Sequence, residues 1–182
     1  MERLRPSSTV VLVIDIQEKL AAAMPRDTLA EVLNNTGILL DAAKTMGVAV
    51  VVSEQYPRGL GPTVSALASK LDSPPLAKMT FDATSDLAIS RRLAELAPAA
   101  VVVVGMESHV CVFQTARELV KRGYTTHVVA DAVCSRKEEN RRIGLSLAER
   151  AGAIVTTTET VCFDWLERAG TDAFKTVSKL VR

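Results

Sequence analysis

The chain contains apolar runs, rich in β-branched residues, that do not alternate with polar residues. The longest reads AAVVVVG over residues 99–105, and related runs occupy 9–16, 47–53, 126–131 and 152–157. A strand that exposes one face to water alternates apolar and polar residues, whereas a continuous apolar run is typical of a strand buried on both faces of a parallel sheet. These runs therefore predict a parallel sheet covered by helices on both sides.

Helical patterns lie between and after the expected strands. They occupy 27–46, 86–97, 111–122, 138–151, 158–168 and 172–181. We expect Asp27 to cap the first of them and Gly47 to end it. This alternation favours right-handed βαβ units, so we predict a three-layer α/β fold and a single domain over residues 1–182. The Pro- and Gly-rich segment 54–85 is expected to be irregular and to border the functional site.

Composition excludes several classes of partner. A formal net charge of +1 and an aromatic content of 4% give neither the basic surface nor the stacking platform of a nucleic-acid-binding protein. No apolar run approaches the roughly 20 residues of a membrane span. The first residues, MERLRPSST, lack the apolar core of a secretory signal. Three cysteines without CxxC spacing predict free thiols in a reducing, cytoplasmic compartment.

The carboxyl ends of the expected strands are the natural place for a site. In an open parallel sheet, ligands bind beyond these ends, near the point where the strand order reverses. Residues at these positions are Asp15, Ser53, Gln55, Asp131 and the stretch from Gly105 to Cys111. A site in this fold should therefore draw its side chains from this set.

Metal-based chemistry is disfavoured by the residues available. Asp15 lacks the second nearby carboxylate that a magnesium-dependent phosphatase needs, and it could equally cap a helix. A catalytic zinc ion needs about three protein ligands. His109 and Cys111 could serve, but the only other histidine, His127, lies within an expected buried strand. We therefore expect no metal and no cofactor.

Cys111 stands where the longest apolar run passes into a helical pattern. A helix N-terminus favours thiolate over thiol, and the N–H groups of the preceding turn can stabilise an oxyanion. A nucleophile also needs a base and an electrostatic partner. Asp15 can supply the base and Lys78 the charge, because a lysine within LAKMTF is expected to be partly buried and to need a carboxylate partner. Two alternatives stay open, namely Lys78 as a surface lysine and a redox pair of Cys111 with Cys134.

These residues lie in segments that resemble the isochorismatase-like hydrolase superfamily, also called the cysteine hydrolases. The matching segments, in order, are VLVIDIQEKL (11–20), SEQYPRGLGPTV (53–64), LAKMTFDA (76–83), 101–136 and 138–164. The Asp-x-Gln after the first strand, the lone lysine and the G-x-x-[ST]-x-x-C turn carry the resemblance. The stretch EQYPRGLGPT is most similar to the branch of isochorismatase domain-containing proteins.

The resemblance implies a Rossmann-like fold with six parallel strands and a catalytic triad of Asp15, Lys78 and Cys111. By this analogy Asp15 takes the thiol proton of Cys111 and returns it to the leaving group, while Lys78 holds Asp15. The resemblance also implies a cis peptide bond between Met106 and Glu107. That bond would aim the N–H groups of Glu107 and Cys111 at the oxyanion of a covalent, thioester-type intermediate.

The resemblance also narrows the substrate. Nicotinamidase-like members carry an Asp-x-His metal pair after the second strand, where this chain has Ser53-Glu54-Gln55, so a metal-independent enzyme is implied. True isochorismatases act on a vinyl ether and some lack the cysteine, so Cys111 favours the C–N bond of a small amide or carbamoyl-like molecule. Candidate pocket residues are Gln17, Leu20, Gln55, Tyr56, His109 and Phe113.

Two further expectations follow from the resemblance. Members of the superfamily usually form oligomers, so we expect a homo-oligomer, a dimer or larger. The alternative to a hydrolase is a catalytically silent member that acts as an interaction or regulatory protein. The complete set of Asp15, Lys78 and Cys111 favours the hydrolase, because a binding module has no need to keep a lysine and an aspartate beside a thiol.

Overall fold

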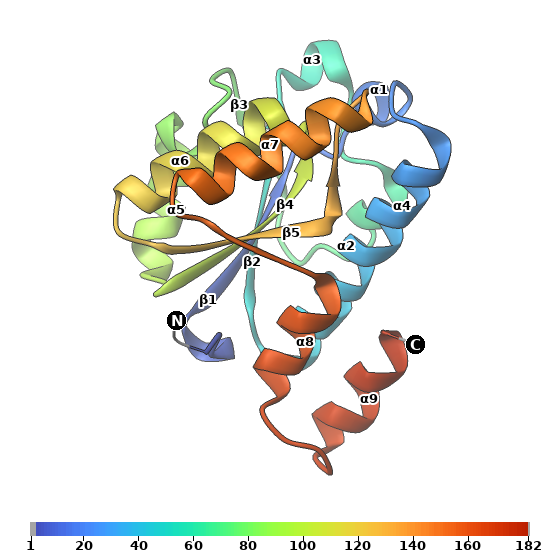
Figure 1. The fold of residues 1–182 in the computed structure, drawn as a ribbon, viewed down its shortest axis with the longest axis vertical. Helices are drawn as coiled ribbons and strands as arrows, with labels where there is room; N and C mark the ends of the chain where they lie inside the picture. Colours follow the sequence, from blue (N-terminus) through green and yellow to red (C-terminus); the bar gives the residue numbers. More distant parts are fainter. Residues whose placement is uncertain (1–2, 182) are drawn as a thin grey trace.

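The computed structural model describes residues 3–181 and contains a six-stranded sheet (Figure 1). The strands are β1 Thr9–Ile14, β2 Ala49–Gln55, β3 Leu76–Lys78, β4 Ala100–Met106, β5 Thr125–Cys134 and β6 Ile154–Thr156. They pair in the order β3-β2-β1-β4-β5-β6, and every pair is parallel. The predicted α/β/α Rossmann-like fold with six parallel strands is confirmed. Residues 1, 2 and 182, at the ends of the expected domain, lie outside the described residues.

Helices cover both faces of the sheet. One face carries α2 Arg26–Met46, α8 Thr158–Leu166 and α9 Asp172–Leu180, and the other carries α5 Leu87–Leu96, α6 Phe113–Lys121 and α7 Glu138–Arg150 (Figure 1). The connections contain α1 Glu18–Ala21, α3 Pro57–Leu60, α4 Ser65–Ala68, 3-10 turns at Pro6–Ser8 and Ala83–Ser85, and a π-helical turn at Ser108–Val112. Within residues 3–181, no helix is long and apolar enough to cross a membrane.

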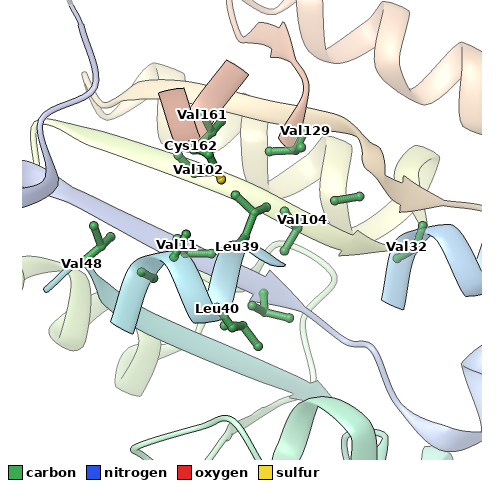
Figure 2. Packing of buried hydrophobic residues seen from close by; sticks show 14 of the residues in the cluster. Val11, Val32, Leu39, Leu40, Val48, Val102, Val104, Val129, Val161 and Cys162 are labelled. Carbon is green, nitrogen blue, oxygen red and sulfur yellow. The ribbon is translucent and has the colours of Figure 1, made fainter. Parts of the chain in front are cut away.

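Successive side chains of the central strands point to opposite faces and fill two separate cores. The core beneath α2 includes Val11, Val102 and Val104, which lie around Leu39 and Leu40 (Figure 2). Alternate residues of the same strands belong to the core beneath α5, α6 and α7. Each central strand is therefore buried on both faces, which is why its sequence does not alternate.

The structure corrects two predictions in the first half of the chain. The strand β3, Leu76–Lys78, lies inside the segment that we expected to be irregular, because three residues are too few to show a pattern. The helix α2 begins at Arg26 after Pro25, so Asp27 lies in the first turn and does not cap the helix. A carboxylate in the first turn still interacts favourably with the positive end of the helix dipole. Gly47 ends α2 in a left-handed conformation, with φ 71°, as predicted.

Asp131 does not lie at a strand end, because β5 continues to Cys134. Its carboxylate accepts hydrogen bonds from the backbone N–H of Thr158 at 2.9 Å and from the hydroxyl of Thr158 at 3.0 Å. Thr158 is the first residue of α8. Through these hydrogen bonds, Asp131 of β5 holds the first turn of α8 against the sheet.

The strand order reverses between β1 and β4, the two central strands. At their carboxyl ends Ile14 pairs with Gly105, and the φ of Gly105 is +119°. A Cβ atom at this position would lie 2.0 Å from the carbonyl oxygen of Ile14. Only glycine therefore permits this close approach, which brings the residue after β1 beside the turn after β4.

Candidate active site

A buried ion pair occupies the carboxyl end of the sheet. Lys78, the last residue of β3, donates from Nζ to Asp15 Oδ2 at 2.7 Å, and both side chains are completely buried. Asp15 follows β1 directly and has a left-handed backbone, with φ 52°. Burying two charges is costly unless they are paired and hydrogen-bonded. Lys78 is therefore no surface lysine, and this region of the chain is built around its contact with Asp15.

Ser53 and Gln55 complete the hydrogen bonding of the pair. The Ser53 hydroxyl donates to Asp15 Oδ1 at 2.7 Å. Lys78 also donates to Gln55 Oε1 at 2.6 Å and to the carbonyl of Thr80 at 3.1 Å, so all three of its protons are used. The sequence placed Ser53 at a strand end of the expected site, but Ser53 was not among the candidate catalytic or pocket residues. Gln55 holds Lys78 directly.

Cys111 lies in the π-helical turn Ser108–Val112, and α6 begins only at Phe113. The prediction that Cys111 opens the helix is therefore wrong. The predicted lowering of its thiol pKa by the helix dipole is wrong as well. Burial, followed by the negative charge of Asp15, raises the pKa of the Cys111 thiol to about 12, while Lys78 acts in the opposite direction. Cys111 thus lies within electrostatic reach of both buried charges and is a protonated thiol at neutral pH.

The other two thiols also have raised pKa values, so the free energy of unfolding should decrease as pH rises in the alkaline range. Burial raises the pKa of Cys134 and of Cys162 to about 12, above the ordinary thiol pKa of about 8.5. The stability that each contributes is complete below about pH 8.5 and is lost as pH rises towards about 12. We expect each to reduce the free energy of unfolding by up to about 1.4 kcal/mol per pH unit in that window.

Urea unfolding of the wild type and of Cys162→Ala between about pH 8 and pH 10.5 measures this loss. Other groups titrate equally in both proteins, so the difference in slope isolates the thiol. Wild type should lose stability more steeply than the variant. Parallel slopes would refute the raised pKa of Cys162.

The redox pair of Cys111 and Cys134 is disfavoured by packing. Cys134 belongs to the core beneath α2, whereas Cys111 belongs to the core beneath α5, α6 and α7. All three cysteines are free and buried. Cys134 and Cys162 have the surroundings of small buried hydrophobic side chains.

The turn between β4 and Cys111 is anchored through Glu107. The peptide bond between Met106 and Glu107 is cis, and the Glu107 carbonyl accepts from the N–H groups of Val110 and Val112 at 3.0 and 3.2 Å. The Glu107 carboxylate accepts from both the backbone N–H and the Nε of Arg136 at 3.0 Å. Burial alone would raise the pKa of Glu107, but the hydrogen bonds from Arg136 outweigh burial and hold that pKa below its usual range.

His109 fixes the other side of the same turn. Its Nδ1 lies 3.0 Å from Ser135 Oγ, and its Nε2 lies 3.3 Å from Asn140 Nδ2. An asparagine amide can only donate to Nε2, so Nδ1 carries the proton and donates to Ser135. Gly144 of α7 packs against the backbone of this turn, and a Cβ atom at Gly144 would lie 2.6 Å from the backbone nitrogen of His109. His109 is thus a support of the turn that bears Cys111.

The remaining predicted pocket residues have distinct surroundings. Gln17 is completely buried, donates to the carbonyls of Gln55 and Gly61 and accepts from the N–H of Gln55, so it ties β2 to the following loop. Leu20 packs against the core beneath α2. Phe113 packs against the opposite core and lies 5.2 Å beneath the guanidinium of Arg117. Tyr56, in contrast, is half-exposed beside Gln55.

Residues 3–181 contain no group of three or more His, Cys, Asp or Glu side chains arranged to hold a metal ion. The side chains of Ser53 and Gln55 are both hydrogen-bonded to the buried pair, Ser53 to Asp15 and Gln55 to Lys78. The geometry therefore assigns these two residues to the support of Asp15 and Lys78.

Comparison with known proteins identifies the family. The model of the isochorismatase domain matches residues 9–160. The chain belongs to the isochorismatase family. Among its relatives, the secreted isochorismatase effector Isc1 of Phytophthora sojae is 37% identical over 99% of this chain and 87% of its own length. Isochorismatase domain-containing protein 2 of Danio rerio is 34% identical over 98% of this chain and 89% of its own length.

Solved structures agree with this membership of the isochorismatase family. The structure of the MAR1 ribonuclease from Caenorhabditis elegans superposes with a TM-score of 0.92 at 35% identity, over 99% of this chain and 92% of that one. Membership makes the chain an isochorismatase-like hydrolase. The β1, β3 and β4 ends that carry Asp15, Lys78 and Cys111 all lie within the matched residues.

Proposed function

We propose that this protein is a metal-independent cysteine hydrolase that cleaves the C–N bond of a small amide or carbamoyl-like molecule. Asp15 accepts the thiol proton of Cys111 as the sulfur attacks the carbonyl carbon. The N–H groups of Glu107 and Cys111 stabilise the oxyanion. The C–N bond then breaks, and Asp15 delivers the proton to the leaving nitrogen. Water hydrolyses the resulting thioester and regenerates the thiol.

The buried pair of Lys78 and Asp15 is the observation that carries the proposal. A protein that only binds a partner gains little from two charges taken out of water, because such a pair often stabilises no better than apolar residues would. A proton shuttle, in contrast, needs a carboxylate held in one position and kept ionised beside the thiol. The raised pKa of Cys111 fits this role for Asp15, because a thiol that stays protonated needs a base at the moment of attack.

An acyl-enzyme trap tests the proposal. The protein is incubated with a panel of small primary amides and carbamoyl compounds, ammonia release is followed, and intact-mass spectrometry after acid quenching detects an acyl adduct. We expect turnover of at least one compound and an adduct that maps to Cys111. Cys111→Ala is the inactive variant, Cys134→Ala is the matched thiol control, and a single-stranded RNA oligonucleotide serves as a substrate of unrelated chemistry.

Each result has a defined meaning. Ammonia release that survives in Cys111→Ala would remove Cys111 from the reaction. An adduct on Cys134 would favour redox or adventitious thiol chemistry. If Cys111 reacts with no member of the panel, the protein is better explained as a catalytically silent member that acts through interactions. The same conclusion would follow if iodoacetamide labelled Cys111 no faster than Cys162.

The proposal includes a cytoplasmic setting and a homo-oligomer of at least two copies. Three free thiols suit a reducing compartment, although the relative from Phytophthora sojae is named as a secreted protein. Sedimentation equilibrium of the purified protein measures the assembly, and a single species at the mass of one chain would contradict the oligomer.

A further inference from the structure

Two large apolar side chains lie exposed on one face of α7. Ile143 is 40% exposed and Leu147 is 37% exposed. Because they are four residues apart in a helix, they lie one turn apart on the same face. All other exposed residues of α7 are polar or charged, and its buried residues are Gly144 and Ala148. An apolar pair outside the core of an otherwise polar helix surface is typical of a contact with another protein.

Four exposed charges on the same helix have no ionic partner within the described residues. They are Glu139, Arg142, Glu149 and Arg150. None of them forms a salt bridge within residues 3–181, whereas the other two charges of α7 pair with each other at 2.9 Å. Charges that are unmatched within their own chain can be matched across an interface by charges of opposite sign.

The order of these residues along α7 makes the helix complementary to itself. When two copies of a helix pack antiparallel about a two-fold axis, each residue meets the one that lies equally far on the other side of the axis. An axis at Leu145 matches the two apolar residues with each other and every unpaired charge with a charge of opposite sign. The matched positions, each joining one copy to the other, are Ile143 with Leu147, Glu139 with Arg150, and Arg142 with Glu149.

The position of α7 leaves this surface available. The helix lies on the outside of the sheet, beside α6 (Figure 1). Asn140 and Gly144 of α7 support the turn that bears Cys111, whereas the exposed residues take no part in that support. With 13 residues, α7 is about 20 Å long. An interface of this size is small, so we expect an association that depends on protein concentration.

Building on the homo-oligomer in the proposed function, we infer that a second copy of this chain docks on α7, with the two α7 helices antiparallel about a two-fold axis at Leu145. The contact buries Ile143 and Leu147 of both copies. It also joins the acidic first turn of each helix to the basic last turn of the other. Because the same surface is used by both copies, each side-chain contact occurs twice.

Sedimentation equilibrium at a series of protein concentrations tests the apolar contact. Leu147→Glu sets a charge against Ile143 of the partner subunit at two symmetric positions, so the dissociation constant should rise about 100-fold or more. The mass should fall to half that of the wild-type assembly. Leu87→Glu is the matched control, because Leu87 is 63% exposed on α5, and it should keep the wild-type mass. Circular dichroism verifies that each variant is folded.

Charge reversals test the antiparallel register. Glu139→Arg and Arg150→Glu each set like charges against each other at two symmetric positions, so each should raise the dissociation constant about ten-fold. The double variant restores opposite charges and the wild-type net charge, and should recover most of the lost affinity. Both reversals interact unfavourably with the dipole of α7, so recovery in the double variant cannot come from a more stable helix.

The outcomes separate this inference from the proposed function. A wild-type oligomer that Leu147→Glu and both single reversals leave unchanged would place the interface elsewhere and overturn the inference, while the homo-oligomer stands. Single reversals that weaken association without recovery in the double variant would overturn the antiparallel arrangement. A monomeric wild type would overturn both the inference and the homo-oligomer. None of these results bears on the reaction at Cys111, which the acyl-enzyme trap tests independently.

Discussion

Lys78→Met is expected to lower the free energy of unfolding by about 3–5 kcal/mol, because it leaves the Asp15 carboxylate buried without its cation. It also removes the donor to Gln55 Oε1 and to the Thr80 carbonyl. Methionine fills a volume similar to the lysine stem, so the loss reports the missing charge and hydrogen bonds rather than a cavity. Urea unfolding followed by the fluorescence of Trp165, which is the only tryptophan and is buried, measures the change.

Lys70→Met is the matched control for this prediction. Lys70 Nζ lies 2.7 Å from Asp41 Oδ2, the same distance as in the buried pair, but the Lys70 side chain is 35% exposed. A solvated pair of this kind contributes about 1 kcal/mol or less. The double variant Asp15→Asn with Lys78→Met should recover part of the loss, because no charge is then buried alone. A Lys78→Met variant as stable as Lys70→Met would contradict the role given to the buried pair.

Asp15→Asn is expected to separate the acidity of the thiol from catalysis. The negative charge of Asp15 raises the pKa of Cys111 and the positive charge of Lys78 lowers it, so removing the former should bring that pKa below about 12. The thiolate therefore forms at a lower pH than in the wild type. Turnover should nevertheless fall by about 10²–10⁴-fold, because asparagine can neither accept the thiol proton nor protonate the leaving nitrogen.

Two measurements on one protein sample decide this prediction. The ultraviolet absorbance of the thiolate against pH gives the pKa of Cys111, with Cys111→Ala subtracted as the blank. The amine released from an active substrate gives the turnover. Ser53→Ala provides the matched comparison, because it removes one hydrogen bond to Asp15 and leaves the carboxylate. Turnover that rises together with the thiolate fraction in Asp15→Asn would mean that the thiolate alone is enough and that Asp15 is no proton shuttle.

The layered sheet and two of the three central residues could be predicted from sequence because burial on both faces leaves a strong pattern. Strands such as Thr9–Ile14 and Ala100–Met106 are apolar at every position, and their carboxyl ends are then defined. Asp15 and the turn to Cys111 follow those ends directly. Lys78 was located through its apolar neighbours and the family resemblance, since its strand is only three residues long.

Other features of the site depend on burial and on contacts between residues that are far apart in the sequence, which no local pattern encodes. The dipole of the following helix was expected to lower the pKa of Cys111, whereas burial and the charge of Asp15 raise that pKa. The π-helical turn before Phe113 differs from an α-helix by one residue in its hydrogen bonding, and its side-chain pattern is too short to show this. The pairing of Ser53 with Asp15 joins residues from two strands, which only the register of β1 and β2 fixes.

The strand order also divides the sheet into two halves that are each continuous in sequence. Residues 9–78 supply β1, β2 and β3, residues 100–156 supply β4, β5 and β6, and the two sets of strands pair with each other only between β1 and β4. The Asp15–Lys78 pair lies in the first half and Cys111 in the second. A chain cut between Lys78 and Ala100 would bring the thiol to its base only after the two fragments dock, so Cys111 would act as a built-in reporter of their reassembly.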